Sequence, residues 1–366
     1  MMSVKRFSVL LTALLFLTFT SCSDYSEIST SQPPEKEIKN VILMIGDGMG
    51  LPDVYAAMTV ATSPLNIQRT KVTGLQINYS ANNYITDSGA SGTALATGTK
   101  TNNYSIGVDA QGNKVKSILE IAEENKLSTG LVSTSAITHA TPASFIAHQS
   151  SRSSYEDIAL DFLKTDVDVI IGGGYNHFAV RKDNLNLLDS LRKRGYDVVN
   201  SVDAMTRSTA SKLAAFTAPD HNPYRLKGRG DMLPLATAKA IEILSRNNKG
   251  FFLMVEGSQI DFAGHANAAD TLIDEVIDFD KAVGVAIDYA ERVGNTLVVV
   301  TADHETGGVT IVGGNRNDHT VDLDFSRKDH TAVMIPVYVF GPGAYSFTGI
   351  YDNTDIFRKI KAALGI

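Results

Sequence analysis

Three pairs of acidic and imidazole side chains in the C-terminal part of the chain have the residue types and spacing of a metal site. They are Asp261 with His265, Asp303 with His304, and Asp329 with His330. The first pair is spaced i and i+4, which places both side chains on one face of a helix. Carboxylate oxygens and imidazole nitrogens are ligands of Zn²⁺. Each pair alone is equally well explained by a salt bridge or a surface hydrogen bond, so the metal interpretation rests on their occurring together.

A run of small residues, ITDSGASGT from Ile85 to Thr93, surrounds the hydroxyl of Ser88. Helix-permissive residues follow, so Ser88 is predicted to lie near a helix N-terminus, where backbone N–H groups favour negative charge. A lone serine at such a position is usually only an N-cap. A serine hydroxyl needs a base or a metal to become an effective nucleophile. The run does not match the Gly-x-Ser-x-Gly elbow, which disfavours a conventional serine esterase.

Short apolar runs rich in β-branched residues alternate with helical patterns along the chain. This alternation predicts an α/β fold with a central, mostly parallel sheet flanked by helices on both faces. The predicted strands are 41–45, 130–133, 167–171, 251–255, 296–301 and 335–340. The predicted helices are 116–124, 155–163, 185–194, 235–245 and 270–292. No linker divides residues 40–366, which we expect to form one large catalytic domain, with a small inserted flap or cap at 200–230, where strand signals are few.

Three acidic residues follow three of these predicted strands. Asp47 follows the first, Glu256 follows 251–255, and Asp303 follows 296–301. In an open parallel sheet, ligands bind in the loops beyond the carboxyl ends of the strands. One Asp-Gly pair after a strand is more often a turn. Three acids expected at one edge of the sheet favour a site for cations.

The N-terminus has the composition of an export signal. Lys5 and Arg6 precede an apolar run at 9–20, which is too short to span a bilayer comfortably. We therefore expect residues 1–21 to be a cleaved signal peptide. The run ends at Ser21-Cys22, which resembles the bacterial lipoprotein processing site, although Phe19 departs from the usual aliphatic residue there. A secretory signal with an incidental cysteine is the alternative.

Composition limits what the mature chain can do. Cys22 is the only cysteine, so no internal disulfide can form. Residues 22–39 are rich in Ser and Glu, contain Pro33-Pro34 and are expected to be a flexible tether. The net charge is −7. The predicted signal carries two positive charges and no negative ones, so its removal would lower the net charge to −9. An acidic surface repels nucleic acid, and a phosphate ester would need local positive charge from metals or arginine.

Seven segments resemble, in order, the motifs of the alkaline phosphatase family. They are GDGMG from Gly46, ITDSGASGT from Ile85, HATPA from His139, SSR ending at Arg152, VEGSQIDFAGH from Val255, TADHETGG from Thr301 and DHT from Asp329. The segments cover the chain almost from the tether to the C-terminus. The resemblance implies the metal-dependent hydrolysis of small-molecule phosphate monoesters, through a phosphoserine intermediate on Ser88.

The resemblance also implies two Zn²⁺ ions and one Mg²⁺ ion per chain. One zinc would bind Asp261, His265 and His330, and the other would bind Asp47, Asp303, His304 and the Ser88 oxygen. The third ion would bind Asp47, Thr141 and Glu256, with His139 beside it. Arg152 and Asp87 would bind substrate. The family further implies a homodimer, and the N-terminal signal implies attachment to a bacterial membrane through a lipid on Cys22, in the periplasm or at the cell surface.

Two positions vary within the family that the chain resembles. His139 stands where members carry Asp or His, and an imidazole there would admit zinc or cobalt as well as magnesium. Phe262 stands where many members have a Lys or His that reaches phosphate through water. An aromatic ring cannot make that contact, so we predict looser phosphate binding and faster product release. The remaining histidines match no ligand position, and most are expected to be structural or exposed; for His221, in the expected flap, contact with substrate is the minor alternative.

Two alternative functions stay open from the sequence. Hydrolysis of phosphodiesters, phosphonates or sulfate esters uses the same two-metal chemistry, but the chain has no Cys/Ser-x-Pro-x-Arg run of the sulfatase type, and Arg152 favours phosphate monoesters. A lipoprotein that only scavenges phosphate or metal is the second alternative. Such a protein would not need a nucleophile between two metal sites.

Overall fold

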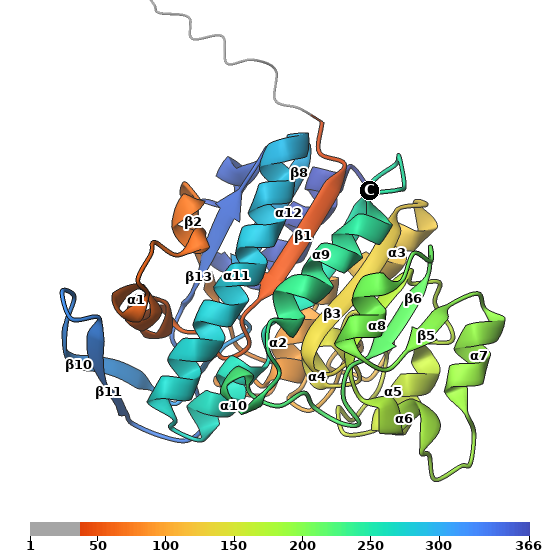
Figure 1. Cartoon of the computed structure of the whole chain (residues 1–366), viewed down its shortest axis with the longest axis horizontal. Coiled ribbons are helices and arrows are strands. Elements are labelled where there is room, and N and C mark those ends of the chain that lie inside the picture. The colour runs from red at the N-terminus through yellow and green to blue at the C-terminus, as the bar shows by residue number, and fades with distance from the viewer. Residues whose placement is uncertain (1–36) are drawn as a thin grey trace, which may run out of the picture. The chain divides into compact units, whose positions relative to one another are not determined.

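The computed structural model describes residues 37–366, so the predicted signal peptide, Cys22 and nearly all of the tether lie outside the described residues. A ten-stranded sheet in the order β14-β2-β13-β8-β1-β7-β3-β4-β6-β5 forms the centre (Figure 1). Its strands are β1 Asn40–Ile45, β2 Val72–Ile77, β3 Ser128–Ala136, β4 Val169–Gly173, β5 Asp197–Val199, β6 Leu213–Phe216, β7 Phe251–Glu256, β8 Thr296–Thr301, β13 Ile335–Phe340 and β14 Gly349–Asp352. Within this sheet β13 runs antiparallel to both of its neighbours and the other pairs are parallel. The predicted mostly parallel sheet is confirmed.

Helices cover both faces of the sheet (Figure 1). They are α1 Leu51–Val60, α2 Ser88–Thr97, α3 Ile118–Glu124, α4 Ala140–Ala143, α5 Tyr155–Asp161, α6 Tyr175–Ala179, α7 Leu187–Lys193, α8 Val202–Arg207, α9 Met232–Leu244, α10 Gln259–His265, α11 Ala269–Val293 and α12 Thr354–Leu364. Short 3₁₀ helices occupy Asn66–Arg69, Arg225–Lys227 and Ala344–Phe347. Each predicted helix overlaps one of these α-helices.

Alternating side chains of the central strands enter two separate hydrophobic cores. In β1, Ile42 and Met44 pack with α1, α9 and α11, whereas Val41, Leu43 and Ile45 pack with the layer that contains α2, α3, α5 and α12. All six residues of β1 are buried. Burial on both faces explains why the sequence of β1 is a continuous apolar run rather than an alternating one.

The register of the central strands brings their carboxyl ends level. Ile45 of β1 lies beside Glu256 of β7 and Thr301 of β8. The residues that follow these strands therefore start from the same edge of the sheet. This is the edge at which the sequence predicts acidic side chains.

Two smaller sheets follow β8 in the chain. Strands β9 (Glu305–Thr306) and β12 (His330–Thr331) pair antiparallel, so that His330 lies beside Thr306. Strands β10 (Val309–Asn315) and β11 (Thr320–Phe325) form a hairpin that extends from the body of the molecule (Figure 1). The pairing of β12 with β9 places His330, a predicted metal ligand, close to the chain segment that follows β8.

The expected flap at 200–230 is wrong for part of its length. Strand β6 (Leu213–Phe216) is fully buried and pairs with β4 and β5 inside the central sheet. Its short sequence, LAAF, has only four residues and two alanines, so its strand signal is weak. The loop after β6 crosses the end of the sheet and carries His221.

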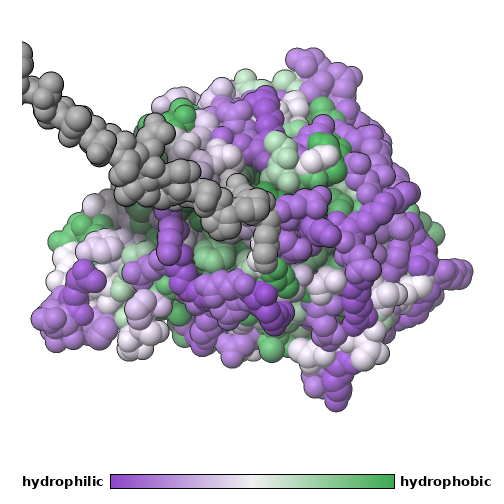
Figure 2. Space-filling view, turned by 90° about the horizontal axis from the view of Figure 1, so that it is seen from above, coloured by the Kyte–Doolittle hydropathy of each residue, from purple (hydrophilic) through white to green (hydrophobic). Residues whose placement is uncertain are grey.

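The surface of the described residues is illustrated by one face of the molecule. Figure 2 shows a face on which hydrophilic residues predominate and hydrophobic residues are scattered in small groups. Among residues 37–366, no helix has both the length and the apolar character needed to cross a bilayer.

Candidate active site

Buried acidic side chains gather at the carboxyl edge of the sheet, as the strand order predicts. Asp47, Glu256 and Asp303 all have zero solvent exposure. The Gly48 N–H donates to Asp303 Oδ1 at 3.2 Å, which ties the loop after β1 to the loop after β8. Adjacent strands thus bring together residues that are more than 200 positions apart in the chain.

The first metal-competent group consists of Asp47, Asp303 and His304, whose ligand atoms lie within 4.8 Å of one another. His304 Nε2 is 3.5 Å from Asp47 Oδ1 and 3.3 Å from Asp303 Oδ2. Burial and the neighbouring imidazole of His330 lower the pKa of His304 well below its usual range. A neutral imidazole beside two carboxylates is a suitable set of ligands for Zn²⁺.

Ser88 lies beside this group with its hydroxyl free of helix capping. The N-cap of α2 is Asp87, whose Oδ1 accepts from the Ala90 N–H at 2.9 Å. Ser88 is the first residue of the helix, and its Oγ is 3.2 Å from His304 Nε2. Asp87, and not Ser88, therefore caps α2, so the alternative interpretation of Ser88 as an N-cap residue does not apply.

The second metal-competent group consists of Asp261, His265 and His330. Asp261 Oδ1 is 3.4 Å from His265 Nε2 and 3.6 Å from His330 Nε2. The i and i+4 spacing predicted for the first two holds, because both lie on α10. The Nδ1 atoms of the two rings are 2.6 and 2.9 Å from backbone carbonyls of Lys328 and Thr86. These contacts favour protonated Nδ1 and leave both Nε2 atoms free to bind a metal.

The third group consists of Asp47, His139 and Glu256. Thr141 Oγ1 donates to the other Asp47 oxygen, Oδ2, at 3.2 Å, and Ser133 Oγ donates to Glu256 Oε2 at 2.5 Å. Burial and the charge of Arg152 lower the pKa of His139 well below its usual range, so its ring is neutral. Asp47 belongs to both this group and the first, as the sequence motifs imply.

Arg152 lies at the mouth of the site in the loop before α5. Its Nη1 donates to Asp87 Oδ2 at 2.9 Å, and its Nη2 is 3.4 Å from His139 Nε2. The ion pair fixes the guanidinium close to the start of α2, where Ser88 lies. The structure thus brings every predicted site residue into one continuous arrangement.

Several buried polar atoms in this arrangement lack a hydrogen-bond partner among residues 37–366. They are Asp47 Oδ1, Asp303 Oδ2, Glu256 Oε1 and His139 Nδ1. Burial raises the pKa of Asp47 well above its usual range, and burial together with the charge of Asp261 raises the pKa of Asp303 to about 7. Buried polar groups are normally paired, and buried carboxylates normally face cations. The donor set therefore fits bound metal ions.

Thr306 is a site residue that the sequence did not single out. Its Oγ1 donates to Asp261 Oδ1 at 2.5 Å and lies 3.2 Å from His304 Nδ1. One hydroxyl thus connects a carboxylate of the second group to an imidazole of the first. Its place in the TADHETGG segment was the available signal, but a threonine there is equally compatible with strand β9.

The loop after β6 adds a further imidazole to the edge of the site. The His221 ring packs edge-on against His139 at 5.2 Å and against Phe262 at 5.1 Å between ring centroids. Its Nδ1 accepts from the Ala136 N–H at 3.1 Å. His221 therefore supports the ring of His139, a contact that the sequence could not predict.

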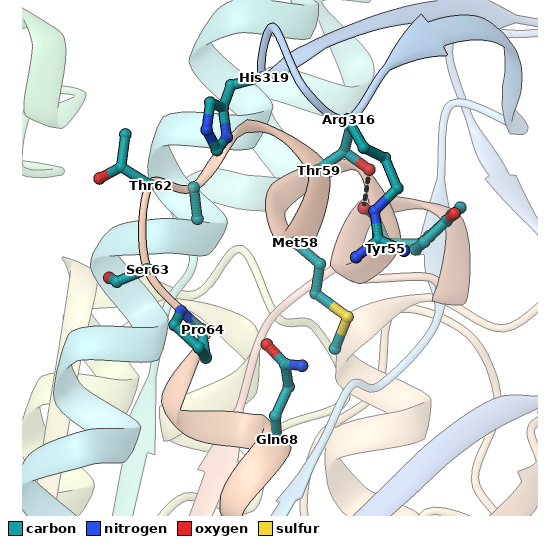
Figure 3. Close-up of a pocket in the computed structure, with 10 residues that line it drawn as sticks. Tyr55, Met58, Thr59, Thr62, Ser63, Pro64, Gln68, Arg316 and His319 are labelled. Carbon is teal, nitrogen blue, oxygen red and sulfur yellow. Dashed lines mark hydrogen bonds between the residues drawn. The ribbon is translucent and has the colours of Figure 1, made fainter.

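Two hollows of different character flank this end of the molecule. A cavity of about 500 Å³ is lined by Asp87, Arg152 and His330 and opens directly onto the site. A smaller hollow between α1 and the β10–β11 hairpin is lined by residues such as Tyr55 and His319 (Figure 3). It contains none of the predicted site residues, whereas Asp87, Arg152 and His330 line the larger cavity.

Comparison with known proteins agrees with this geometry. A model of the alkaline phosphatase family matches residues 38–323. The chain belongs to the alkaline phosphatase family. It is 35% identical to alkaline phosphatase 4 of Bacillus subtilis over 91% of each chain, and 33% identical to the alkaline phosphatase of Escherichia coli over 91% of this chain and 87% of that one.

Solved structures of alkaline phosphatases have the same fold. The alkaline phosphatase of the Antarctic bacterium TAB5 is 41% identical, covers 90% of this chain and 98% of its own, and superposes with a TM-score of 0.85. A variant of the TAB5 enzyme, in which a histidine is replaced by aspartate, contains Mg in its M3 site and is 42% identical, with 90% and 99% coverage and a TM-score of 0.85. The predicted activity of this alkaline phosphatase, metal-dependent hydrolysis of phosphate monoesters, is confirmed.

Proposed function

We propose that this alkaline phosphatase acts through a phosphoserine on Ser88. The observation that carries the proposal is the hydroxyl of Ser88 at the start of α2, which does not cap the helix and lies 3.2 Å from His304 Nε2. The Ser88 oxygen attacks phosphorus, the alcohol leaves, and a phosphoserine forms. Water then attacks this intermediate and releases inorganic phosphate with the free serine.

Arg152 and the start of α2 are proposed to hold the phosphoryl group. The planar guanidinium can donate two parallel hydrogen bonds to phosphate oxygens. Asp87 orients the guanidinium through Oδ2 and caps α2 through Oδ1. Backbone N–H groups at the N-terminus of a ten-residue helix add donors and a favourable dipole. The same aspartate therefore aligns both parts of the anion site.

We propose two Zn²⁺ ions and one Mg²⁺ ion for the three metal-competent groups. Asp261, His265 and His330 would hold one zinc, and Asp47, Asp303, His304 and the Ser88 oxygen the other. Asp47, Thr141 and Glu256 would hold magnesium, with His139 allowing zinc or cobalt there as well. When bound, such cations lower the pKa of an attacking hydroxyl and stabilise the attacking and leaving oxygens.

Replacing the nucleophile tests this proposal. Ser88→Ala should lower the rate of nitrophenyl phosphate hydrolysis by at least about a thousandfold, because the substitution removes the attacking oxygen. The control is Ser190→Ala on α7, remote from the site. Metal analysis of both variants shows whether the loss of rate is accompanied by a loss of metal, since the Ser88 oxygen is one of four proposed ligands of that zinc. Equal rates in Ser88→Ala and wild type, or no phosphoserine on Ser88 after acid quenching with substrate, would contradict the mechanism.

Substrate class is tested with the same wild-type sample. Nitrophenyl phosphate should be hydrolysed faster than bis-nitrophenyl phosphate and nitrophenyl sulfate, because Arg152 and the three metal groups suit a dianionic monoester. Faster hydrolysis of the diester or the sulfate would favour the alternative chemistry on the same scaffold. A complete absence of turnover in a zinc- and magnesium-loaded sample would favour a scavenging protein.

We also propose that the chain is lipid-anchored through Cys22 to a bacterial membrane, facing the periplasm or cell surface, and forms a homodimer. The N-terminal signal followed by Ser21-Cys22 supports the anchor, and family resemblance supports the dimer. Cys22→Ser should move the protein from the membrane fraction to the soluble fraction, and light scattering should give twice the chain mass. A wild-type protein that is soluble, or monomeric at micromolar concentration, would contradict the respective proposal.

A further inference from the structure

A tight turn beside the active site carries an aromatic residue where glycine is favoured. In the turn Asn102–Ser105, the Ser105 N–H donates to the Asn102 carbonyl at 3.1 Å. Tyr104, the third residue of the turn, has a φ of 72°. A positive φ at this position is typical of a type II turn, in which Gly or Asn normally stands. A bulky residue in this conformation is strained, and such strain is concentrated at ligand-binding and active sites.

The proposed phosphate-binding residues hold the backbone of Tyr104 from both sides. The Tyr104 N–H donates to Asp87 Oδ2 at 3.0 Å, and the Arg152 N–H donates to the Tyr104 carbonyl at 2.7 Å. The adjacent Asn103 side chain donates to the Ile85 carbonyl at 3.0 Å and accepts from the Asp87 N–H at 3.1 Å. These bonds fix the turn rigidly to the loop that precedes α2.

The side chain of Tyr104 is nevertheless left open to solvent. It is 68% exposed and lines the same cavity of about 500 Å³ as Arg152. The side chains of Asn82 and Asn83 also line this cavity. Among the residues that the structure describes, their amide nitrogens have no hydrogen-bond partner, whereas their Oδ1 atoms accept from backbone N–H groups. The cavity thus combines a flat apolar face with free polar donors, next to the phosphate site.

We propose that Tyr104 forms one wall of a leaving-group site that selects phosphate monoesters whose alcohol carries a flat heterocyclic ring, as in a nucleoside monophosphate. The heterocyclic ring stacks on Tyr104, and the side-chain amides of Asn82 and Asn83 donate hydrogen bonds to acceptor atoms at the edge of the ring. The inference rests on the proposed function, because the phosphate must lie at Arg152 for the ring to reach Tyr104. A strained backbone held by Asp87 and Arg152 keeps the aromatic face in register with the phosphate.

The test compares two esters that differ only in the ring. Adenosine 5′-monophosphate and ribose 5-phosphate both release a primary alcohol, and only the first carries a base. Tyr104→Gly should lower the ratio of their kcat/KM values about tenfold, and Tyr104→Phe should keep the wild-type ratio. The matched control is Tyr84→Ala, since Tyr84 is 78% exposed but does not line the cavity. A thermal melt should show Tyr104→Gly folded, with a Tm roughly 2 °C higher, because glycine accepts the positive φ.

Two results would overturn the inference. One is a wild-type ratio in Tyr104→Gly, and the other is the same change of ratio in Tyr84→Ala. Failure of the proposed function is a separate outcome, because it would appear as no hydrolysis of ribose 5-phosphate by the wild type. In that case calorimetric titration with adenosine 5′-monophosphate decides, and equal affinities of wild type and Tyr104→Gly would overturn the leaving-group site.

Discussion

Unsatisfied buried oxygens are the main energetic feature of the site at the residue scale. Asp47 Oδ1, Asp303 Oδ2 and Glu256 Oε1 have no hydrogen-bond partner among the described residues, although each side chain is fully buried. Each such group costs about 1–3 kcal/mol when left unpaired, and more when it is charged. Neighbouring cations would relieve all three together. Metal binding is therefore expected to stabilise the folded protein by providing partners for these oxygens.

Phe262 is expected to weaken the binding of inorganic phosphate. Its ring packs edge-on against His139 at 5.6 Å between centroids. Phe262→Lys should lower the inhibition constant for inorganic phosphate roughly tenfold and slow product release, because an ammonium group adds a charge-assisted hydrogen bond. Steady-state inhibition and pre-steady-state kinetics measure both effects. Phe262→Met, which has no charge, is the control, and an unchanged inhibition constant in Phe262→Lys would refute the prediction.

At the element scale, one buried arginine attaches the loop after β6 to the long helix α11. Arg229 donates to Glu275 Oε2 at 2.5 Å, to Asp278 Oδ2 at 2.8 Å and to the Pro223 carbonyl at 3.0 Å. The guanidinium side chain is 1% exposed. This loop carries His221 to the edge of the site. The arginine therefore links helix packing to the support of His139.

Removing this arginine should destabilise the protein strongly. Arg229→Met should cost about 3–5 kcal/mol of unfolding free energy, because Glu275 and Asp278 lose the buried guanidinium between them and keep only their contacts with Arg225. Chemical denaturation of the metal-loaded protein measures the loss. The control is Arg207→Met, whose partner Asp203 and own side chain are both more than 70% exposed, and which should have no measurable effect. Similar, small losses in both variants would show that the buried network contributes little.

At the scale of the whole molecule, metal binding and folding are coupled through protonation. Burial and neighbouring carboxylates raise the pKa of Asp303 to about 7 and that of Asp47 well above its usual range. Burial lowers the pKa values of His139 and His304. Below about pH 6.5 the raised carboxyl pKa values and the lowered histidine pKa values change the unfolding free energy in opposite directions as the pH rises, because histidines of the unfolded state are then protonated. Above that pH the two histidines are largely neutral in both the folded and the unfolded state, so of these four groups only the carboxyl groups still change the stability.

Stability of the metal-free protein should therefore fall as the pH rises from about 6.5 to 8. In this range the folded state gives up protons that the unfolded state has already lost, so the contribution of the raised carboxyl pKa values disappears. Thermal melts in chelator at pH 6.5, 7, 7.5 and 8 measure the trend. Samples loaded with zinc and magnesium should lack it, because the cations balance the carboxylates. A metal-free Tm that rises with pH across this range would contradict the coupling.

Local patterns in the sequence predicted the fold class and the acidic and histidine pairs of the site, whereas the grouping of these residues around three ions and the roles of Thr141 and Arg152 came only from the resemblance to a family. Continuous apolar runs predicted the central strands, because buried strands between helical layers carry apolar residues on both faces. The acids after β1, β7 and β8 were predicted at one edge, because parallel strands end on the same side. The i and i+4 spacing predicted that Asp261 and His265 share a helix face. All of these depend on neighbouring residues alone.

Only the tertiary structure decided features that depend on contacts between distant segments. The four-residue strand β6 has little signal of its own and is a strand because β4 and β5 flank it. Asp87 caps α2, so the hydroxyl of Ser88 is not used for capping. Both aspartate and serine are common N-cap residues, so the sequence alone could not decide which of the two caps the helix. The roles of Thr306 and Tyr104 follow from register and cavity shape, to which side chains far apart in the chain contribute. Spacing encodes which residues share an element, whereas packing between elements decides which of them meet.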